Sequence, residues 1–422
     1  ISNNQITEFY THFADNLEND SIWNKIKEIN HQDVAKAEGL GRSTTRLVAS
    51  DKMREDMIAG LREQCNANTI RGNICEKHTH EGWVVECIQS ELGVVAFVFE
   101  GRPNVLADAT GVLRGGNTVV FRIGRDALAT AKSMMDYALN PALVSAGLPY
   151  GSITLVDHES HAAGWALFTD DRLSLAVARG SGSAVKTLGN LASQNGIPVS
   201  LHGTGGAWVI ADNTANPNYF ETVIKHSLDR KVCNTMNVCC IPRSKSETLV
   251  PKLLNALEAA GNARNTSFKL HILEGSESSF PTALFSKEIN VQRAGGEQIE
   301  FQAESLKKSQ LGNEWEWENT PEISVVMIND TEEAIELCNT YSPQFVVSLI
   351  SENKDAHEQL FQSINAPFVG NGFTRWADGQ YALNCPELGL SNWESGRILA
   401  RSAILNGQSV FTIRTRMTQE HG

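Results

Sequence analysis

The chain has 422 residues, of which 41% are apolar and 20% are charged, a composition typical of a soluble globular protein with two or three domains. Its net charge of −13 argues against a nucleic-acid partner, because binding to phosphate backbones depends on positive charge. No run approaches the roughly 18 apolar residues of a membrane span, and the first residues lack the apolar segment of a secretory signal. Eight cysteines without a paired spacing indicate reduced thiols. We therefore expect a cytoplasmic protein with no membrane partner and no metal site.

The first half of the chain changes character near residue 84. Residues before it are polar, with helical patterns at 6–17 and 51–63. Strands are then predicted at 84–88, 93–99, 117–122, 152–156, 173–177, 199–201 and 207–210, with helices at 105–113, 126–139, 161–168 and 183–191. This alternation predicts a parallel α/β sheet, whose ligands bind outside the carboxyl ends of the strands.

The alternation restarts after residue 233. Strands are predicted at 238–241, 270–273, 323–327, 345–350, 368–369 and 409–413, and helices at 245–260, 331–338 and 355–363. Residues 274–318 are rich in Glu and Gln and give only weak signals of structure. The pattern indicates a second parallel α/β unit.

The stretch around Cys233 has the chemistry of a reactive thiol. Arg230 and Lys231 precede the cysteine, polar residues follow it, and a buried strand then begins at 238. A free thiol has a pKa of roughly 8.5, and nearby cations favour the thiolate that acts as a nucleophile. A buried, inert thiol is the alternative interpretation, and it is the one we favour for Cys239 and Cys240.

Asn104 stands where the strand 93–99 gives way to a predicted helix, directly after Pro103. Its side-chain amide can donate a hydrogen bond into the crevice at the carboxyl end of the sheet. The alternative interpretation is that it only caps the helix.

Six short segments follow one another along the chain in a fixed order. They are Arg102-Pro-Asn-Val105, Leu113-Arg-Gly-Gly-Asn-Thr-Val-Val120, Ala146-Gly-Leu-Pro-Tyr-Gly151, Arg179-Gly180, Val232-Cys-Asn-Thr235 and Thr374-Arg-Trp-Ala-Asp-Gly379. Together they resemble the γ-glutamyl phosphate reductases (glutamate-5-semialdehyde dehydrogenases) of the aldehyde dehydrogenase superfamily, from about residue 5 to the C-terminus.

The resemblance implies an aldehyde dehydrogenase-like α/β fold with two Rossmann-like parallel-sheet domains. Residues 1–228 would form the cofactor-binding domain, 229–370 the catalytic domain, and 371–422 a return to the first domain. A hairpin at 82–92 and the strand at 409–413 would make the protein a homo-oligomer.

The resemblance also implies NADPH-dependent reduction of γ-glutamyl phosphate to glutamate-5-semialdehyde, a step of proline biosynthesis. Cys233 would displace phosphate to give a thioester, which hydride from NADPH reduces to the aldehyde. The Asn104 amide and the Cys233 backbone N–H would hold the oxyanion, and one such donor contributes on the order of 3 kcal/mol. The implied substrate-binding residues are Arg102, Arg230, Asn234, Arg375 and Arg401.

For the cofactor, Arg122 and Arg125 close the strand that meets the adenosine ribose in this superfamily. Two guanidinium groups there favour NADP over NAD, while a surface role is the alternative interpretation for Arg125. The turn from Arg179 through Gly180 and Ser181 opens a helix whose N–H groups suit a pyrophosphate. Gly205, near the strand that lines the nicotinamide, and Glu387 complete the expected cofactor-binding set.

Two stretches depart from the family pattern. Hydrolytic superfamily members carry a Glu base where this chain has Leu201-His-Gly-Thr-Gly-Gly206, and its absence fits reduction, which needs no activated water. His202 replaces a small residue there, either as a packed side chain or as a substrate contact. Between 388 and 403 the family's His, Gly and Pro are missing although Arg401 is retained. The alternatives are therefore a reductase of another acyl phosphate or acyl-CoA, and a non-catalytic superfamily member.

Overall fold

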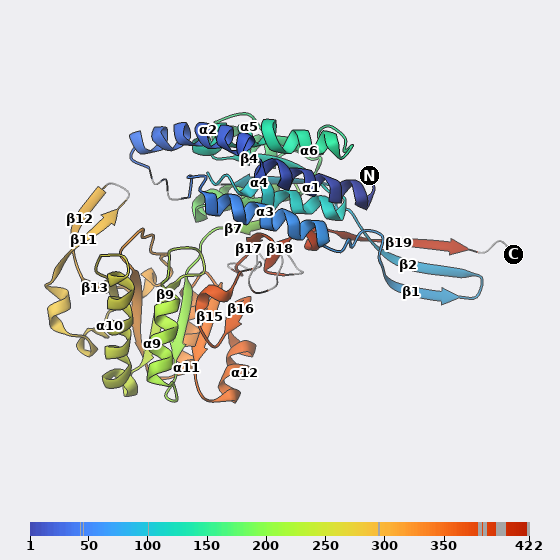
Figure 1. The fold of residues 1–422 in the computed structure, drawn as a ribbon. Coiled ribbons are helices and arrows are strands. Elements are labelled where there is room, and N and C mark those ends of the chain that lie inside the picture. Colours follow the sequence, from blue (N-terminus) through green and yellow to red (C-terminus); the bar gives the residue numbers. More distant parts are fainter. Residues whose placement is uncertain are drawn as a thin grey trace. The chain divides into compact units, whose positions relative to one another are not determined.

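The computed structural model divides into two compact units (Figure 1). It describes residues 1–42, 44, 46–99, 101–293, 296–378, 382, 386–393 and 402–419. The first unit takes its residues from 1–203, 379–391 and 399–422, and the second from 204–378 and 392–398. We expected the first domain to reach residue 228. The structure instead assigns 204–228 to the second unit, because strand β8 (Ala207–Ala211) pairs with β9 (Met236–Pro242).

The first unit is built on a five-stranded parallel sheet of order β5-β4-β3-β6-β7. The strands are β3 (Val94–Phe99), β4 (Thr118–Ile123), β5 (Ile153–Leu155), β6 (Leu173–Arg179) and β7 (Val199–His202). The chain leaves β3 toward β4 and leaves β6 toward β7, in opposite directions along the sheet. The carboxyl ends of β3 and β6 therefore form the topological switch point at which such sheets bind ligands.

Helices cover both faces of this sheet. They are α1 (Asn3–Glu18), α2 (Asp20–Gly39), α3 (Asp51–Asn66), α4 (Val105–Ala109), α5 (Leu128–Met134), α6 (Asn140–Ser145), α7 (His161–Phe168) and α8 (Gly182–Gln194). Alternate residues of β3 face opposite ways: Phe97 packs with α1 to α6, and Val98 packs with α7 and α8. This period of two is what a parallel strand buried on both faces requires.

Helix α2 escaped prediction because its buried stripe is partly polar. Asn30 and Asp33 lie in that stripe and break the apolar repeat. Asn30 donates to the Leu47 carbonyl oxygen at 2.9 Å, and the Asp33 carboxylate accepts from the Thr130 hydroxyl at 2.7 Å. The spacing of apolar residues does not predict a helix whose buried face carries polar side chains that are paired by hydrogen bonds.

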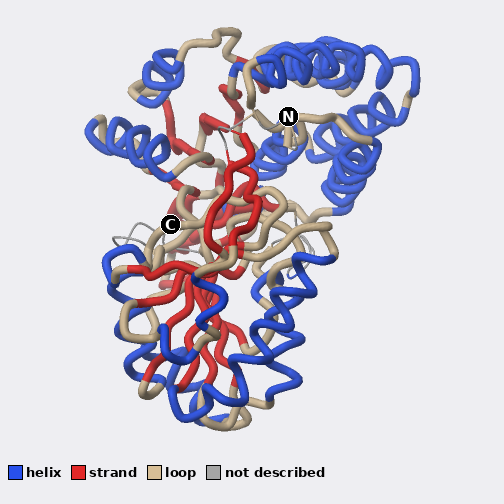
Figure 2. The backbone as a smooth tube through the Cα atoms, turned by 90° about the vertical axis from the view of Figure 1, so that its left-hand side faces the viewer, coloured by secondary structure: helices blue, strands red, loops and turns tan. Residues whose placement is uncertain are grey.

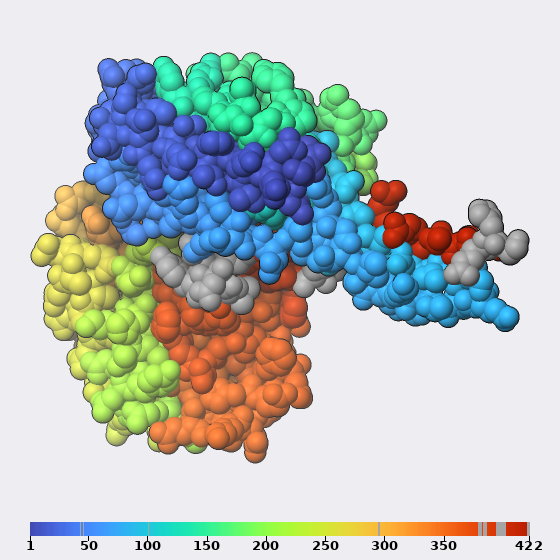
Figure 3. Space-filling model, turned by 45° about the vertical axis from the view of Figure 1, so that its right-hand side comes forward, coloured from blue at the N-terminus to red at the C-terminus, as the bar shows by residue number. Residues whose placement is uncertain are grey.

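A separate three-stranded sheet also belongs to the first unit, and Figure 3 shows its light-blue hairpin with the red strand alongside. Its strands are β1 (Ile74–His80), β2 (Trp83–Ser90) and β19 (Thr412–Gln419), all antiparallel. The expected hairpin at 82–92 thus begins earlier, since β1 is exposed throughout and lacks apolar alternation. The expected strand 409–413 begins later, because Asn406 caps a helical turn over Gly407–Ser409. The short strands β17 (Glu387–Leu390) and β18 (Ile404–Asn406) pair with each other.

The second unit has a seven-stranded parallel sheet with helices on both faces (Figure 2). The strand order is β13-β10-β14-β9-β8-β15-β16. The remaining strands are β10 (Lys269–Leu273), β13 (Ala303–Leu306), β14 (Glu322–Ile328), β15 (Val346–Ile350) and β16 (Phe368–Gly370), and the helices are α9 (Pro217–His226), α10 (Ser246–Asn262), α11 (Thr331–Tyr341) and α12 (Lys354–Ser363). Cys239 packs with α9 and α10 and Cys240 with the opposite core, so the prediction that both thiols are buried is confirmed.

The weakly predicted stretch contains a charged hairpin, β11 (Glu288–Arg293) and β12 (Gly296–Phe301). Arg293 makes ion pairs with Glu300 of the hairpin and with buried Glu322 of β14, at 2.7 and 2.6 Å. Strand β11 also buries Ile289 and Val291, but β12 is mostly exposed, so only one strand of the hairpin carries an apolar face, which explains the weak signal. Among the helices that the structure describes, none is long and apolar enough to cross a membrane.

Candidate active site around Cys233

Cys233 lies exposed in the turn between α9 and β9. The Thr235 hydroxyl accepts from the Val232 N–H at 2.9 Å and donates to the Arg230 carbonyl oxygen at 2.6 Å, which closes the turn. The Gly206 N–H donates to the Cys233 carbonyl oxygen at 2.6 Å. The cysteine is thus held by its backbone while its side chain stays accessible, as a nucleophile requires.

Gly205 packs directly on the backbone of Cys233. A Cβ atom at this position would lie 2.6 Å from the Cys233 Cα, closer than side-chain atoms approach. Only glycine fits between the two turns without moving one of them. The residue that we expected near the nicotinamide therefore has a structural reason to be glycine.

Two expected substrate-binding residues are engaged with the protein itself. The buried Asn234 amide donates to the Ala377 carbonyl oxygen at 2.8 Å and accepts from Arg375. The Arg375 Nε also donates to Asp229 at 2.7 Å, and the Thr374 hydroxyl donates to the Asn234 carbonyl oxygen at 2.7 Å. These bonds fasten residues 374–377 to the cysteine turn, so both polar side chains serve to hold it.

The remaining residues of this group differ in placement. Arg230 is exposed next to the cysteine turn, where a charged ligand can reach it. Lys231, the second cation that precedes the cysteine in the sequence, is only 7% exposed and pairs with Glu314. Arg401 lies outside the described residues. Sequence inspection missed Glu314, since it lies in the Glu- and Gln-rich stretch and belongs to no motif.

In the first unit, Asn104 precedes α4 in a helical backbone conformation and makes no side-chain capping bond. Its Nδ2 instead donates to the Asp108 Oδ2 at 3.2 Å. The helix-cap interpretation therefore fails, and the amide is held one turn along the helix by a carboxyl group.

Asp108 has an unusual electrostatic environment. Burial raises the pKa of its carboxyl group to about 7, with Glu387 adding to the rise and Arg179 and Arg102 opposing it. Three residues that we expected at the site, Arg102, Arg179 and Glu387, thus act on the same carboxyl group. Asp108 was not predicted as a site residue, because an acid near a helix start is ordinarily solvated.

We expect Asp108→Asn to stabilise the protein at alkaline pH. Because the folded-state pKa is raised from 3.8 to about 7, the folded protein loses stability as pH rises through this range. The neutral amide removes the penalty, of order 2 kcal/mol near pH 8 after allowance for residual exposure, and changes little near pH 4. Urea unfolding at both pH values measures this. Asp157→Asn, at an exposed acid paired with Lys132, is the control, and an equal pH effect in both variants would contradict the assignment.

The turn after β6 is tied to the C-terminal segment. The Arg179 Nη1 donates to the Leu388 carbonyl oxygen at 2.9 Å, and its guanidinium lies over the Phe99 ring at 5.8 Å. The Gly180 N–H donates to the His202 carbonyl oxygen at 3.2 Å, so it serves the sheet rather than a ligand. Ser181 is the N-cap of α8, whose first turn faces the pocket described next.

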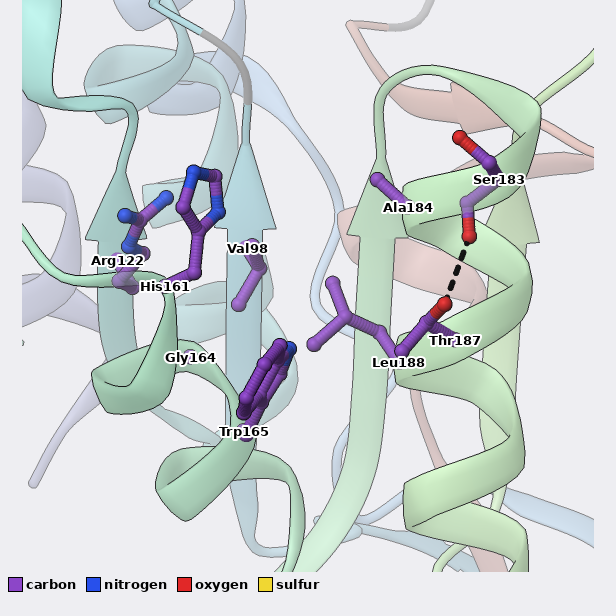
Figure 4. Close-up of a pocket in the computed structure, with 9 residues that line it drawn as sticks. All are labelled: Val98, Arg122, His161, Gly164, Trp165, Ser183, Ala184, Thr187 and Leu188. Atoms are coloured by element: carbon purple, nitrogen blue, oxygen red, sulfur yellow. Dashed lines mark hydrogen bonds between the residues drawn. The ribbon is translucent and has the colours of Figure 1, made fainter.

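A pocket of about 210 Å³ opens at the switch point between α7 and α8 (Figure 4). Val98, Arg122, His161, Gly164, Trp165, Ser183, Ala184, Thr187 and Leu188 line it. Arg122 is buried, its Nη2 donates to the Glu159 carbonyl oxygen at 3.0 Å, and its Nε finds no acceptor among the described residues. An apolar slot with an aromatic wall and one buried cation suits a nucleoside carrying an anionic group. Arg125 does not line the pocket, and its exposed side chain lies 3.7 Å from Asp126.

His202 is a packed side chain. A Cβ atom on Gly389 would lie 2.5 Å from the His202 ring, and the Ser200 hydroxyl lies 3.0 Å from its Nε2. Burial and the nearby Arg179 lower the pKa of His202 to about 3, so the ring is neutral. The His202 ring therefore packs against Gly389, which favours the packed side chain over the substrate contact as the interpretation of His202.

Comparison with known proteins finds similarity to one group of enzymes. The model of the aldehyde dehydrogenase family matches residues 104–269. The γ-glutamyl phosphate reductase of Geobacillus sp. (strain WCH70) is 26% identical over 403 residues, covering 93% of this chain and 88% of that protein. The enzyme of the same name from Thermoanaerobacter sp. (strain X514) is 27% identical over 390 residues, covering 90% and 86%.

Solved structures agree in fold. The crystal structure of γ-glutamyl phosphate reductase from Thermotoga maritima aligns with a TM-score of 0.84 at 20% identity, covering all of this chain and 95% of the other. An acetylating aldehyde dehydrogenase from Geobacillus thermoglucosidasius aligns with a TM-score of 0.66 at 16% identity, covering 100% and 93%. The expected α/β architecture with two parallel-sheet units is thereby confirmed.

Proposed function

We propose that this chain, which has the fold of the aldehyde dehydrogenases, belongs to that superfamily and reduces γ-glutamyl phosphate to glutamate-5-semialdehyde with NADPH, a step of proline biosynthesis. The observation that carries this function is the accessible Cys233 thiol on a turn fixed by hydrogen bonds. Its support is the likeness to γ-glutamyl phosphate reductases over about nine tenths of the chain.

The proposed reaction uses the thiol twice. The Cys233 sulfur attacks the acyl carbon, the bond to the phosphate oxygen breaks, and phosphate leaves with its electron pair to give a thioester. NADPH, when bound, supplies the hydride that reduces this thioester. The carbon–sulfur bond then breaks, the thiolate leaves, and the aldehyde is released. The Cys233 N–H and the Asn104 amide donate to the oxyanion in both steps, and exposed Arg230 attracts the phosphate.

The proposed cofactor site is the pocket between α7 and α8. Trp165 and Leu188 offer apolar surface to an adenine, and buried Arg122 offers a guanidinium whose Nε has no acceptor among the described residues. A 2′-phosphate supplies the negative charge that such a group selects, so NADP is proposed over NAD. The first turn of α8, after Ser181, offers its N–H groups to the pyrophosphate.

Arg122→Gln tests the cofactor assignment. We expect it to raise the KM for NADPH by about 10- to 100-fold, the value of one charge-assisted hydrogen bond, and to leave the KM for NADH nearly unchanged. Arg125→Gln is the matched control, because that guanidinium is exposed and does not line the pocket. Initial rates with both coenzymes measure the effect. An equal rise in KM for NADPH and NADH in Arg122→Gln would show that Arg122 does not bind the 2′-phosphate, and would contradict the proposed preference for NADP.

The substrate is tested in the oxidative direction. Glutamate-5-semialdehyde and NADP⁺ should give NADPH when phosphate or arsenate is present, because these oxyanions release the acyl group from sulfur. Dependence on coenzyme A instead would identify an acyl-CoA reductase, the second candidate, which the altered residues 388–393 favour. A panel of acyl donors with NADPH then identifies the acyl group. Absence of turnover with every donor would indicate a non-catalytic superfamily member.

We also propose that the protein is a cytoplasmic homo-oligomer that joins through the sheet β1-β2-β19. This sheet exposes Ile74, Trp83, Ile413 and Met417, apolar residues that a partner subunit would cover. Light scattering on wild type and on Met417→Glu tests the interface. The charged variant should dissociate, and an unchanged mass would refute this surface. The seven cysteines among the described residues are thiols rather than disulfides, which supports the proposed reducing compartment.

A further inference from the structure

Glu314 lies in the segment between β13 and β14, and its carboxylate is engaged at both oxygens. One oxygen pairs with the Lys231 ammonium, and the other accepts from the Gly205 N–H at 2.5 Å. The two side chains are only 7% and 13% exposed, so the pair is shielded from water. A shielded pair of this kind is held in one geometry, because separating its charges is costly there.

The segment that carries Glu314 is itself fastened on either side of it. The Asn237 amide donates to the Asn313 carbonyl oxygen at 2.8 Å and accepts from the Trp315 N–H at 2.9 Å. The Trp315 ring stacks on His271 with 3.6 Å between centroids. Asn237 belongs to β9, four residues after Cys233. The segment that carries Glu314 is therefore hydrogen-bonded to the strand that follows the cysteine.

The peptide that Glu314 holds is the one that touches the cysteine. Gly205 packs on the Cys233 backbone so closely that no Cβ atom fits, and the next N–H, that of Gly206, donates to the Cys233 carbonyl oxygen at 2.6 Å. Lys231 lies two residues before the cysteine. The Lys231–Glu314 pair therefore joins the two chain segments that define where Cys233 stands.

We propose that Glu314 is a positioning residue for Cys233. Through its ion pair with Lys231 and its hydrogen bond to Gly205, it holds the turn 204–206 against the cysteine turn and so fixes the position of the thiol. The proposal deepens the proposed function, since it takes Cys233 as the nucleophile. It assigns Lys231 to the same structural pair rather than to the binding of phosphate. Neither residue needs to contact the substrate.

Glu314→Gln tests the proposal with a readout that does not require the reductase reaction. Glutamine keeps the size of the side chain but loses the charge that orients it against Lys231. We expect the rate constant for alkylation of Cys233 by iodoacetamide, followed by mass spectrometry of its peptide, to fall about tenfold. The rate is measured at about pH 10, where the thiol is ionised in every variant, so that it reports how well the turn presents the sulfur to the reagent and not its ionisation. In the reductase assay kcat should fall by a similar factor, with the KM for the acyl donor unchanged.

Glu316→Gln is the matched control. Its carboxylate lies 3.8 Å from the same ammonium but is 70% exposed, and it should react at the wild-type rate. If alkylation slowed equally in both variants, the effect would come from the loss of a negative charge near Lys231 and not from positioning, which would overturn the proposal. So would wild-type alkylation in Glu314→Gln.

A double variant, Lys231→Met with Glu314→Gln, covers the case in which the single variant leaves a buried cation and unfolds. Replacing both partners of a buried pair is often neutral for stability. We expect a thermal midpoint near that of wild type together with slow alkylation of Cys233, because the glutamine is no longer oriented. Full recovery of the wild-type rate would mean that only charge balance matters, and would overturn the positioning role. Wild-type protein that alkylates normally but turns over no donor refutes the proposed function and leaves this comparison valid.

Discussion

Alanine at position 233 is expected to abolish the oxidation of NADPH by the acyl phosphate, by at least about 10⁴-fold in kcat, the scale seen when a nucleophile is removed. Without the sulfur there is no thioester for the hydride to reduce. The side chain is exposed and the turn is held by backbone and Thr235 bonds, so Cys233→Ala should keep the thermal midpoint of wild type. Absorbance of NADPH with donor generated in the assay measures the loss.

The control for this prediction is Cys75→Ala. Cys75 is a second exposed thiol, and it lies in strand β1, which contains no residue that we place in the reaction. It should retain full activity, whereas mass spectrometry of wild type mixed with donor should find the acyl group on the Cys233 peptide alone. Retained turnover in Cys233→Ala would remove the covalent step.

The turn that carries Cys233, the proposed nucleophile, was predictable because its signals are local. An apolar run from Val238 to Ile241 marks a strand buried on both faces, and a polar stretch before it marks a turn. Burial raises the pKa of the Cys239 and Cys240 thiols, while Cys233 stays exposed, as the pattern indicated. Strand–helix alternation likewise predicts the two parallel sheets, since each βαβ unit is a local pattern.

The contacts that fix the site were not predictable, because each joins distant segments through polar groups. Glu314 meets Lys231 across 83 positions in the sequence, and Arg375 meets Asn234 across 141. Without the fold, an arginine or amide near the nucleophile is naturally assigned to the substrate. The structure shows that Asn234 and Arg375 satisfy each other, and that the ring of His202 fills space left by Gly389. Buried polar groups find partners that spacing does not reveal.

Asn104→Ala is expected to lower kcat by about 10²- to 10³-fold while the thiol remains as reactive toward iodoacetamide as in wild type, because one oxyanion donor is lost and the nucleophile is not. The amide is oriented before the reaction begins. Its Nδ2 donates to the Asp108 carboxyl group at 3.2 Å, and the Asn104 side chain makes no capping bond to the helix. A donor fixed before the reaction does not have to be ordered during it, which is the source of the large factor.

Asn104→Asp sharpens this prediction, because it keeps the size of the side chain and replaces the donating amide with a carboxyl group. It also places a second carboxyl group beside Asp108, whose pKa is already raised to about 7, so the loss should deepen as pH rises and both acids ionise. Asn195→Ala, at an exposed asparagine that ends α8, is the control and should leave kcat unchanged. Steady-state kinetics across the pH range compares the three. A raised KM with an unchanged kcat in Asn104→Ala would contradict this prediction, because the amide would then bind the ground state of the substrate. The oxyanion would need another donor, and the Cys233 N–H would be the group to examine.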